Sequence, residues 1–343
     1  MLLRNCVCYS PPLGFHLTSK LCNFDPKGEV RMRRRRILFA TLAMLLSATL
    51  SHAAAPQSSS STGVPVEIVV TAVSRHGGDT PVINREDVMV YEGRERDTVT
   101  DWVPAQGDRA ALDLFLLIDD TTSTSIGSQL DDLRQFITSQ PPTTKVGVAY
   151  MLDGIAQVLQ NPTEDHAQAA KALRLPMGQP GVNTSPYFSL SDLVKRWPKD
   201  GARHEVVMVS DGIDRFWGSG PDDPYVDTAV EDAQRAGVIV FSIYNPGMGR
   251  HGTSYWRFWW GQIYLSKLSD QTGGQGYYFG FTGAAVSFAP FLDDIAERLR
   301  HQYWLTFLAK PQKKAGMQPI KVRTELHHVE LVAQDHVYVP ASE

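Results

Sequence analysis

The sequence predicts an α/β protein with a doubly wound, mostly parallel sheet, together with a small accessory β-sandwich-like domain built from both flanks of the chain. Helical segments separate three short apolar runs that are typical of strands buried on both faces, at 114–118, 206–210 and 238–244. Such an alternation of strand and helix indicates a parallel sheet with right-handed crossovers. On both flanks, alternating apolar segments follow one another without intervening helices, which predicts antiparallel strands.

Length and composition set limits on the class of protein. The chain has 343 residues and 43% hydrophobic residues, which is enough for one large domain and a smaller one. Residues 54–343 hold 25 Lys or Arg and 35 Asp or Glu, a formal charge of about −10. This acidic balance argues against nucleic-acid binding through an overall basic surface.

The start of the chain contains a predicted export signal that does not begin at Met1. Arg33–Arg36 are followed by an apolar run at 37–50 and by a small-x-small cleavage site that ends at Ala53. Because Met32 directly precedes the arginines, we expect residues 1–31 to be a non-native or wrongly assigned extension and 32–53 to be the signal peptide. We therefore expect an exported protein, periplasmic or extracellular.

The apolar run has 14 residues, too few for a comfortable membrane span, so no integral span is expected in the mature chain. A buried or anchoring helix is the alternative. All three cysteines precede residue 32, which leaves the mature chain without disulfides or thiol catalysis.

The mature chain divides into four predicted parts: a linker at 54–63, an N-terminal β segment at 64–108, the α/β domain at 109–305 and a C-terminal β segment at 306–343. Strands outside the α/β core are predicted at 64–72, 88–91, 98–103, 303–310, 320–326 and 329–339. Helices are predicted from Ser128 to 137 and at 165–173, 185–197, 226–236, 262–271 and 288–299.

A cluster of acid and hydroxyl groups follows the first buried strand. Asp119 and Asp120 precede five hydroxyl side chains at 121–125. Asp119, Thr121 and Ser123 alternate, so a turn could direct their oxygens into one space. The carboxyl ends of strands in open α/β sheets bind ligands, and hard oxygen donors suit Mg²⁺. We expect Asp120 to support the site or to face solvent rather than to bind the cation.

Two further motifs occur downstream, one containing Thr184 (Gly-Val-Asn-Thr-Ser-Pro, 181–186) and one containing Asp211 (Ser-Asp-Gly, 210–212) after a buried strand. Together with Asp119-x-Thr121-x-Ser123 they resemble the von Willebrand factor A (VWA) domain, and the flanks resemble the accessory segments of bacterial secreted VWA-related proteins. The resemblance implies a Rossmann-like sheet that carries a metal-ion-dependent adhesion site. Its ligands would be Asp119, Thr121, Ser123, Thr184 and Asp211.

In that family the site holds a divalent cation, usually Mg²⁺, with Mn²⁺ and Ca²⁺ as alternatives here. An exposed Asp or Glu of a protein partner would complete the coordination shell. The family usually has serine where Thr121 stands, and threonine keeps the donor oxygen. Alternative interpretations remain: Thr184 as a helix N-cap, and Asp211-Gly212 as a strand-ending turn. Asp214 is expected to be structural.

An aromatic segment, 254–260, is the other unusual feature. Its rings could form a partner-binding platform, or they could pack between the α/β domain and the β segments. The residues concerned are Tyr255, Trp256, Phe258, Trp259 and Trp260.

The predicted function is secreted, metal-dependent binding or adhesion to a partner carboxylate, without enzymatic activity. A metal-independent structural surface protein and a metal-dependent hydrolase are the alternatives. Asp119-Asp120-Thr121 resembles the aspartate loop of haloacid-dehalogenase-type phosphatases, but the second acid of that loop would stand at position 121. Neither Gly-x-Ser-x-Gly nor His-Glu-x-x-His occurs.

Overall fold

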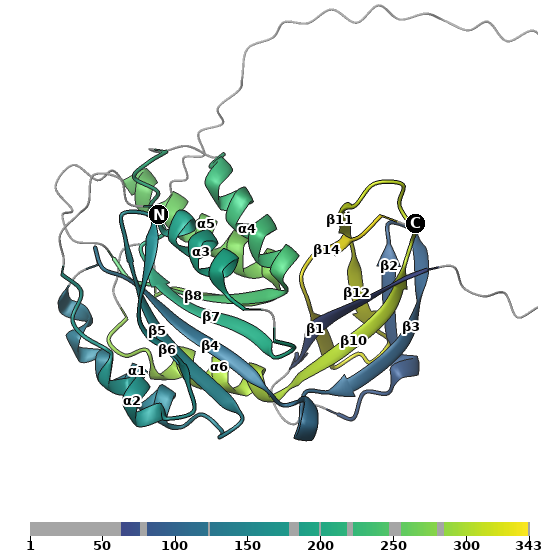
Figure 1. Ribbon diagram of the computed structural model, residues 1–343, viewed down its shortest axis with the longest axis horizontal. Helices are drawn as coiled ribbons and strands as arrows, with labels where there is room; N and C mark the ends of the chain where they lie inside the picture. Colours follow the sequence, from purple (N-terminus) through teal and green to yellow (C-terminus); the bar gives the residue numbers. More distant parts are fainter. Residues whose placement is uncertain are drawn as a thin grey trace, which may run out of the picture. The chain divides into compact units, whose positions relative to one another are not determined.

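The computed structural model describes residues 63–75, 81–122, 124–177, 185–198, 200–217, 222–246, 255–279 and 285–341. The predicted extension and signal peptide lie outside the described residues, as do Ser123 and Thr184. All described residues belong to one contact unit, Ser59–Glu343. They form a mostly parallel sheet covered by helices and a separate antiparallel sheet (Figure 1).

The α/β sheet has the strand order β6-β5-β4-β7-β8-β9. Its strands are β4 (Leu112–Asp119), β5 (Thr144–Leu152), β6 (Ile155–Thr163), β7 (Arg203–Ser210), β8 (Val238–Tyr244) and β9 (Gly276–Tyr277). All neighbours are parallel except β5 and β6, which a tight turn at Asp153-Gly154 joins. Both turn residues have positive φ, 51° and 75°, as the Asp-Gly signal of a hairpin requires. The central strand is therefore β4, which carries the acid and hydroxyl cluster at its end.

Helices cover both faces of this sheet, as expected for a doubly wound fold (Figure 1). Along β4, Leu114, Leu116 and Ile118 pack on one side, and Phe115 and Leu117 pack on the other. The first face is covered by α1 (Leu130–Thr138), α2 (His166–Lys171) and α6 (Ala289–Arg300), and the second by α3 (Pro186–Arg196), α4 (Pro224–Ala236) and α5 (Tyr255–Thr272). Three short 3-10 turns complete the helical elements, η1 (Arg85–Asp87), η2 (Gly107–Arg109) and η3 (Thr124–Ser128).

Two helix starts differ from the prediction. Ser128 belongs to η3, and α1 begins at Leu130 after Gln129, so Ser128 does not cap it. Helix α5 begins at Tyr255, seven residues before the predicted start, because the aromatic segment is itself helical. The predicted helix end before Gly237 is confirmed, and Gly237 adopts the left-handed conformation there (φ 71°).

The antiparallel sheet uses both flanks of the chain, as predicted. Its strand order is β12-β2-β3-β10-β1-β13, and β12 also approaches β13, so the sheet is nearly closed. Its strands are β1 (Val64–Ser74), β2 (Val88–Glu92), β3 (Glu95–Pro104), β10 (Gln302–Ala309), β12 (Lys321–Thr324) and β13 (Val329–Val332). Two further strands, β11 (Gly316–Pro319) and β14 (His336–Val339), pair with each other.

The C-terminal flank therefore holds five strands rather than the three predicted segments. Strand β11 lies where Pro311–Pro319 was expected to separate strands, and the predicted segment 329–339 divides into β13 and β14. A two-stranded pair tolerates Gly316 and Pro319 because few ladder hydrogen bonds are needed.

Arg203, at the start of β7, connects the two sheets. Its guanidinium donates to the backbone oxygens of Leu299 and Ala110 and to Gln302 at the start of β10.

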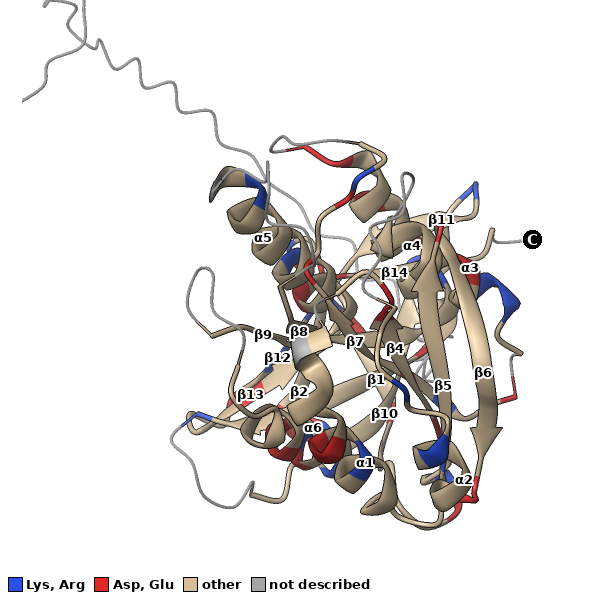
Figure 2. Cartoon of the chain, turned by 90° about the vertical axis from the view of Figure 1, so that its left-hand side faces the viewer, with Lys and Arg blue, Asp and Glu red and all other residues tan. Residues whose placement is uncertain are grey.

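Acidic and basic residues are interspersed along α1 and α6 (Figure 2), the pattern of solvated helix faces. Among the described residues, no helix is both long enough and apolar enough to span a membrane.

Candidate metal centre

Asp119 ends the central strand, and three donors fix its carboxylate. Its Oδ1 atom accepts hydrogen bonds from the Thr121 amide at 2.9 Å and the Thr121 hydroxyl at 2.7 Å. Its Oδ2 atom accepts one from the Ser210 hydroxyl, at the end of β7, at 2.9 Å. The residue is only 3% exposed. The turn after β4 thus brings Thr121 back onto Asp119, as the alternating pattern predicted.

Asp211 follows β7, the strand next to β4, and is 1% exposed. Its Oδ1 atom accepts a hydrogen bond from the Ile213 amide at 2.9 Å, and its Oδ2 atom accepts one from Arg215 Nη2 at 2.9 Å. The next residue, Gly212, has φ +66°, and a Cβ atom there would lie 2.3 Å from the Gly261 carbonyl oxygen of α5. Glycine is required because this loop turns in the left-handed region directly against a helix backbone.

The two acids influence each other electrostatically. Burial and, after it, the charge of the Asp211 carboxylate raise the pKa of the Asp119 carboxyl to about 6, while the Thr121 hydrogen bonds and Arg215 oppose the rise. Two buried carboxylates at the ends of adjacent strands repel each other unless a cation lies near both. Carboxylates and hydroxyls are the oxygen donors that Mg²⁺ prefers, so the described residues fit such an ion.

The structure brings together three of the five predicted metal ligands, Asp119, Thr121 and Asp211. The other two, Ser123 and Thr184, lie outside the described residues. The alternative reading of Thr184 as a helix cap is wrong, because Ser185 caps α3 by accepting a hydrogen bond from the Phe188 amide.

Asp214 holds the loop after β7 in shape. Its Oδ2 atom accepts a hydrogen bond from the Ser185 hydroxyl at 2.6 Å, which ties the start of α3 to this loop. Its Oδ1 atom accepts from the amides of Phe216 and Trp217 at 2.7 Å and 3.0 Å. All its described contacts are therefore with protein donors, which agrees with the structural role expected for it.

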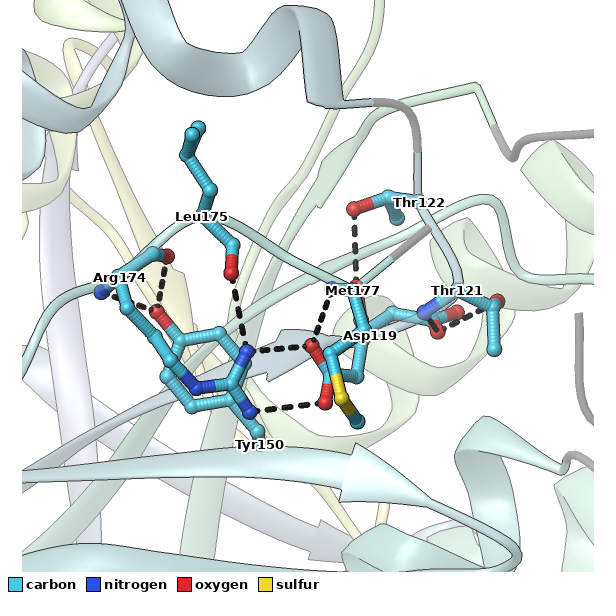
Figure 3. A network of polar contacts seen from close by, with 8 residues as sticks. Asp119, Thr121, Thr122, Tyr150, Arg174, Leu175 and Met177 are labelled. Carbon is cyan, nitrogen blue, oxygen red and sulfur yellow. Dashed lines mark hydrogen bonds and ion pairs between the residues drawn. The ribbon is translucent and has the colours of Figure 1, made fainter. Parts of the chain in front are cut away.

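Asp120 does not face solvent; it is buried and paired with Arg174. Figure 3 shows Arg174 beside Tyr150 and Met177. The guanidinium donates to both carboxylate oxygens, at 2.7 Å and 2.8 Å, and the Met177 amide donates to Oδ1 at 2.9 Å. The same guanidinium stacks over the Tyr150 ring at 4.1 Å, and the Tyr150 hydroxyl donates to the Arg174 carbonyl at 2.6 Å. Asp120 thereby anchors the segment that runs from α2 toward Thr184.

Sequence reasoning missed Arg174 and Arg215. Arg174 stands 54 positions from Asp120 and Arg215 four positions after Asp211, and neither belongs to a motif. Only the spatial neighbourhood of the acids identifies them.

The aromatic half of α5 packs against the α/β domain rather than between the two domains. Trp260 packs against the core beneath α3, α4 and α5 and stacks with Tyr264, with ring centroids 6.1 Å apart. Trp259 contacts Trp260 at 4.8 Å, whereas Trp256 is 62% exposed. Phe258 is partly buried, and the side chain of Tyr255 lies outside the described residues.

A second aromatic cluster, which the sequence did not reveal, lies beside the loop after β7. Phe216 contacts Phe188 of α3 at 5.4 Å and Tyr225 of α4 at 5.5 Å, and Trp217 contacts Tyr225 at 6.1 Å. Phe216 and Trp217 are exposed although they are large and apolar. They directly follow Arg215, whose guanidinium contacts Asp211.

Asp113, Asp200 and His204 form a separate group whose potential ligand atoms all lie within 4.8 Å of one another. Asp113 and His204 are opposite each other near the starts of β4 and β7, so the group lies at the other end of the strands from Asp119 and Asp211. Lys145 of β5 is opposite Asp113 on its other side and supplies a positive charge. The group could hold a cation, but it is not the site that the motifs predicted.

Comparisons with known proteins were made at the level of sequence and of structure. No protein-family model matches the chain, and no curated protein matches it. Among solved structures, it is similar to a von Willebrand factor type A protein from Catenulispora acidiphila, with 9% identity, coverage of 83% of this chain and 76% of that chain, and a TM-score of 0.41.

It is also similar to the conserved hypothetical protein BatB from Bacteroides thetaiotaomicron, with 12% identity, coverage of 55% of this chain and 97% of that chain, and a TM-score of 0.41. A third similar structure is the manganese-loaded TRAP protein of Plasmodium vivax, with 12% identity, coverage of 70% and 98%, and a TM-score of 0.39. The solved structures that are similar to this chain include VWA domains, all at low sequence identity.

Proposed function

We propose that this protein is an exported, metal-dependent binding module that engages a carboxylate of a protein partner through a divalent cation. The observation that carries the proposal is the pair of buried carboxylates, Asp119 and Asp211, at the carboxyl ends of adjacent strands. Ligands bind at this edge in open α/β sheets. VWA domains are typically binding modules rather than enzymes, which supports the same proposal.

In this proposal the cation is held by Asp119, Thr121 and Asp211, together with Ser123 and Thr184, which lie outside the described residues. When bound, the cation supplies positive charge to which an Asp or Glu of the partner can bind. The protein's own part is orientation: Thr121 and Ser210 fix both oxygens of Asp119, and the Ile213 amide fixes one oxygen of Asp211. Mg²⁺ is proposed first, with Mn²⁺ and Ca²⁺ as alternatives.

The exposed rings of Phe216 and Trp217, which lie on the same loop after β7 as Asp211, are proposed to contact the same partner. Aromatic side chains often dominate binding energy at protein interfaces, because they bury a large area with few rotatable bonds. Trp256, on the outer end of α5, is a further exposed ring for this role. Export to the periplasm or the cell exterior remains a proposal based on the predicted signal peptide.

Thermal unfolding with and without metal tests the function. Adding Mg²⁺ or Mn²⁺ at about 100 times its dissociation constant should stabilise the fold by about 2.7 kcal/mol, a rise in Tm of roughly 5–10 °C over the value in EDTA. Asp119→Ala should abolish the rise, and Asp131→Ala, an exposed acid on α1, should leave it intact. Equal Tm values with metal and with EDTA in the unsubstituted protein would refute the proposal.

One observation favours the alternative of a metal-independent surface protein. Arg215 already gives Asp211 a positive partner within the chain. Whether this arginine replaces a cation or yields to one is a separate question, which the geometry of its side chain addresses.

A further inference from the structure

Arg215 lies against the acid pair but is held there weakly. Its Nη2 atom donates one hydrogen bond, to Asp211 Oδ2 at 2.9 Å. Its buried Nη1 atom has no hydrogen-bond partner among the described residues. The side chain is 19% exposed, so the guanidinium sits at the boundary between the acid pair and solvent. Because only one of its two terminal nitrogens is hydrogen-bonded, Arg215 lacks the bidentate geometry that gives strong ion pairs.

Arg174 provides a comparison within the same molecule. It donates to both oxygens of Asp120 and also stacks on Tyr150. Arg174 therefore holds Asp120 through two hydrogen bonds, whereas Arg215 contacts Asp211 through one nitrogen. Of the two arginines, only Arg215 is held so lightly that its aspartate can exchange partners.

The positive charge of Arg215 acts on both acids of the pair. Burial lowers the pKa of Arg215, but the negative charges of Asp211 and Asp119 outweigh this effect and raise it, and the charge of Arg215 in turn opposes the rise in the pKa of Asp119. Arginine remains protonated in proteins, so this charge is permanent. A divalent cation bound by Asp119 and Asp211 would lie close to the Arg215 guanidinium, and the two positive charges would repel each other.

The loop after β7 explains why the guanidinium reaches this place. Asp214 fixes the turn by accepting hydrogen bonds from the amides of Phe216 and Trp217, and Gly212 packs against α5. Arg215 stands between these fixed points, so its side chain returns toward Asp211, four residues earlier. The position is built into the loop and does not require a bound ligand.

We infer that Arg215 is a tethered cation: it neutralises the Asp119/Asp211 pair when no divalent ion is bound, and it must release Asp211 when one binds. This inference rests on the proposed metal site and adds its regulation. Its consequence is that the unsubstituted protein binds divalent cations more weakly than its acid pair alone would. Removing the charge at position 215 therefore strengthens metal binding.

Binding of Mn²⁺ to the purified full chain, measured from the electron paramagnetic resonance signal of free Mn²⁺, tests this inference without any activity assay. Arg215→Gln keeps a polar side chain of similar reach but removes the charge, and it should lower the dissociation constant at least tenfold. Arg215→Lys keeps the charge and should bind within about threefold of the unsubstituted protein. Adding Asp119→Asn to Arg215→Gln should remove the tightened binding. Circular dichroism and the Tm without metal show that each variant is folded.

The outcomes separate this inference from the proposed function. Equal or weaker Mn²⁺ binding by folded Arg215→Gln overturns the tethered cation and leaves the metal site standing. Absence of binding by both proteins overturns the metal site, and the inference with it. Binding by Arg215→Gln alone supports the tethered cation and shows that Arg215 substitutes for the metal in the unsubstituted protein.

Discussion

Removing Arg174 should destabilise the fold more than neutralising its partner Asp120. The two side chains form a bidentate ion pair, but they differ in burial: the Asp120 side chain is fully buried and that of Arg174 is 36% exposed. Arg174→Met leaves a buried carboxylate with a single described donor, the Met177 amide. Asp120→Asn leaves a guanidinium that water can reach, and the new amide oxygen can still accept from Met177.

The expected magnitudes follow from this asymmetry. Loss of one partner from a buried pair typically costs about 3–5 kcal/mol, so Arg174→Met should lie in that range. Asp120→Asn should cost about 1–2 kcal/mol, since it weakens hydrogen bonds without stranding a charge. The double variant should be more stable than Arg174→Met alone, because an amide in the buried position needs no counter-charge.

Urea unfolding at pH 7, followed by tryptophan fluorescence, gives the free energy of each variant, and an unchanged slope with urea confirms that the same transition is compared. Arg134→Met is the matched control, because its pair with Asp131 is exposed and should contribute less than about 1 kcal/mol. The reasoning fails if Asp120→Asn costs as much as Arg174→Met, or if the double variant is the least stable of the three.

Two further predictions concern the buried interior. Burial raises the pKa of Glu205 to about 7 against the charge of Arg203, so the folded state holds this proton more tightly than the unfolded state, and stability falls as pH rises from about 4.5 to 7. The change in unfolding free energy caused by Glu205→Gln should therefore be about 3 kcal/mol more favourable at pH 8 than at pH 4.5; a more favourable change at the lower pH contradicts this. Gly261→Ala would place a Cβ atom 2.3 Å from the Asp211 carbonyl oxygen, so it should destabilise by about 1–3 kcal/mol in urea unfolding although alanine favours helices. Gly316→Ala, with open space around it, is the control, and a stabilising Gly261→Ala refutes the close approach.

The buried strands and the helix ends with specific signals were predictable from the sequence. Strands β4, β7 and β8 are buried along their length and contain the apolar runs 114–118, 206–209 and 238–241, because helices cover both faces of the sheet. Gly237 and Ser185-Pro186 mark helix ends because only certain residues suit those backbone positions. These features depend on residues that are close together in the chain, so they can be predicted from the sequence.

Features that depend on contacts between distant residues were not predictable. The aromatic start of α5 lacks a helical apolar stripe because its rings pack on one another as well as on the core. Strand β11 contains glycine and proline and forms only because β14 pairs with it. Asp120 was expected not to bind the cation, but its burial and its pairing with Arg174, 54 positions away in the chain, could not be predicted from local sequence.

The two arginines at this edge of the sheet explain how four acids coexist there. Asp214 is satisfied by protein donors, and Asp120 has a permanent partner in Arg174, so neither is available to a cation. Asp119 has its hydrogen bonds from Thr121 and Ser210, but hydroxyls and an amide do not neutralise its charge. Its neighbour Asp211 accepts one hydrogen bond from Arg215. The Asp119/Asp211 pair therefore has one arginine for two buried carboxylates, and in the proposed site this pair holds the metal and the displacement of Arg215 sets how tightly the metal binds.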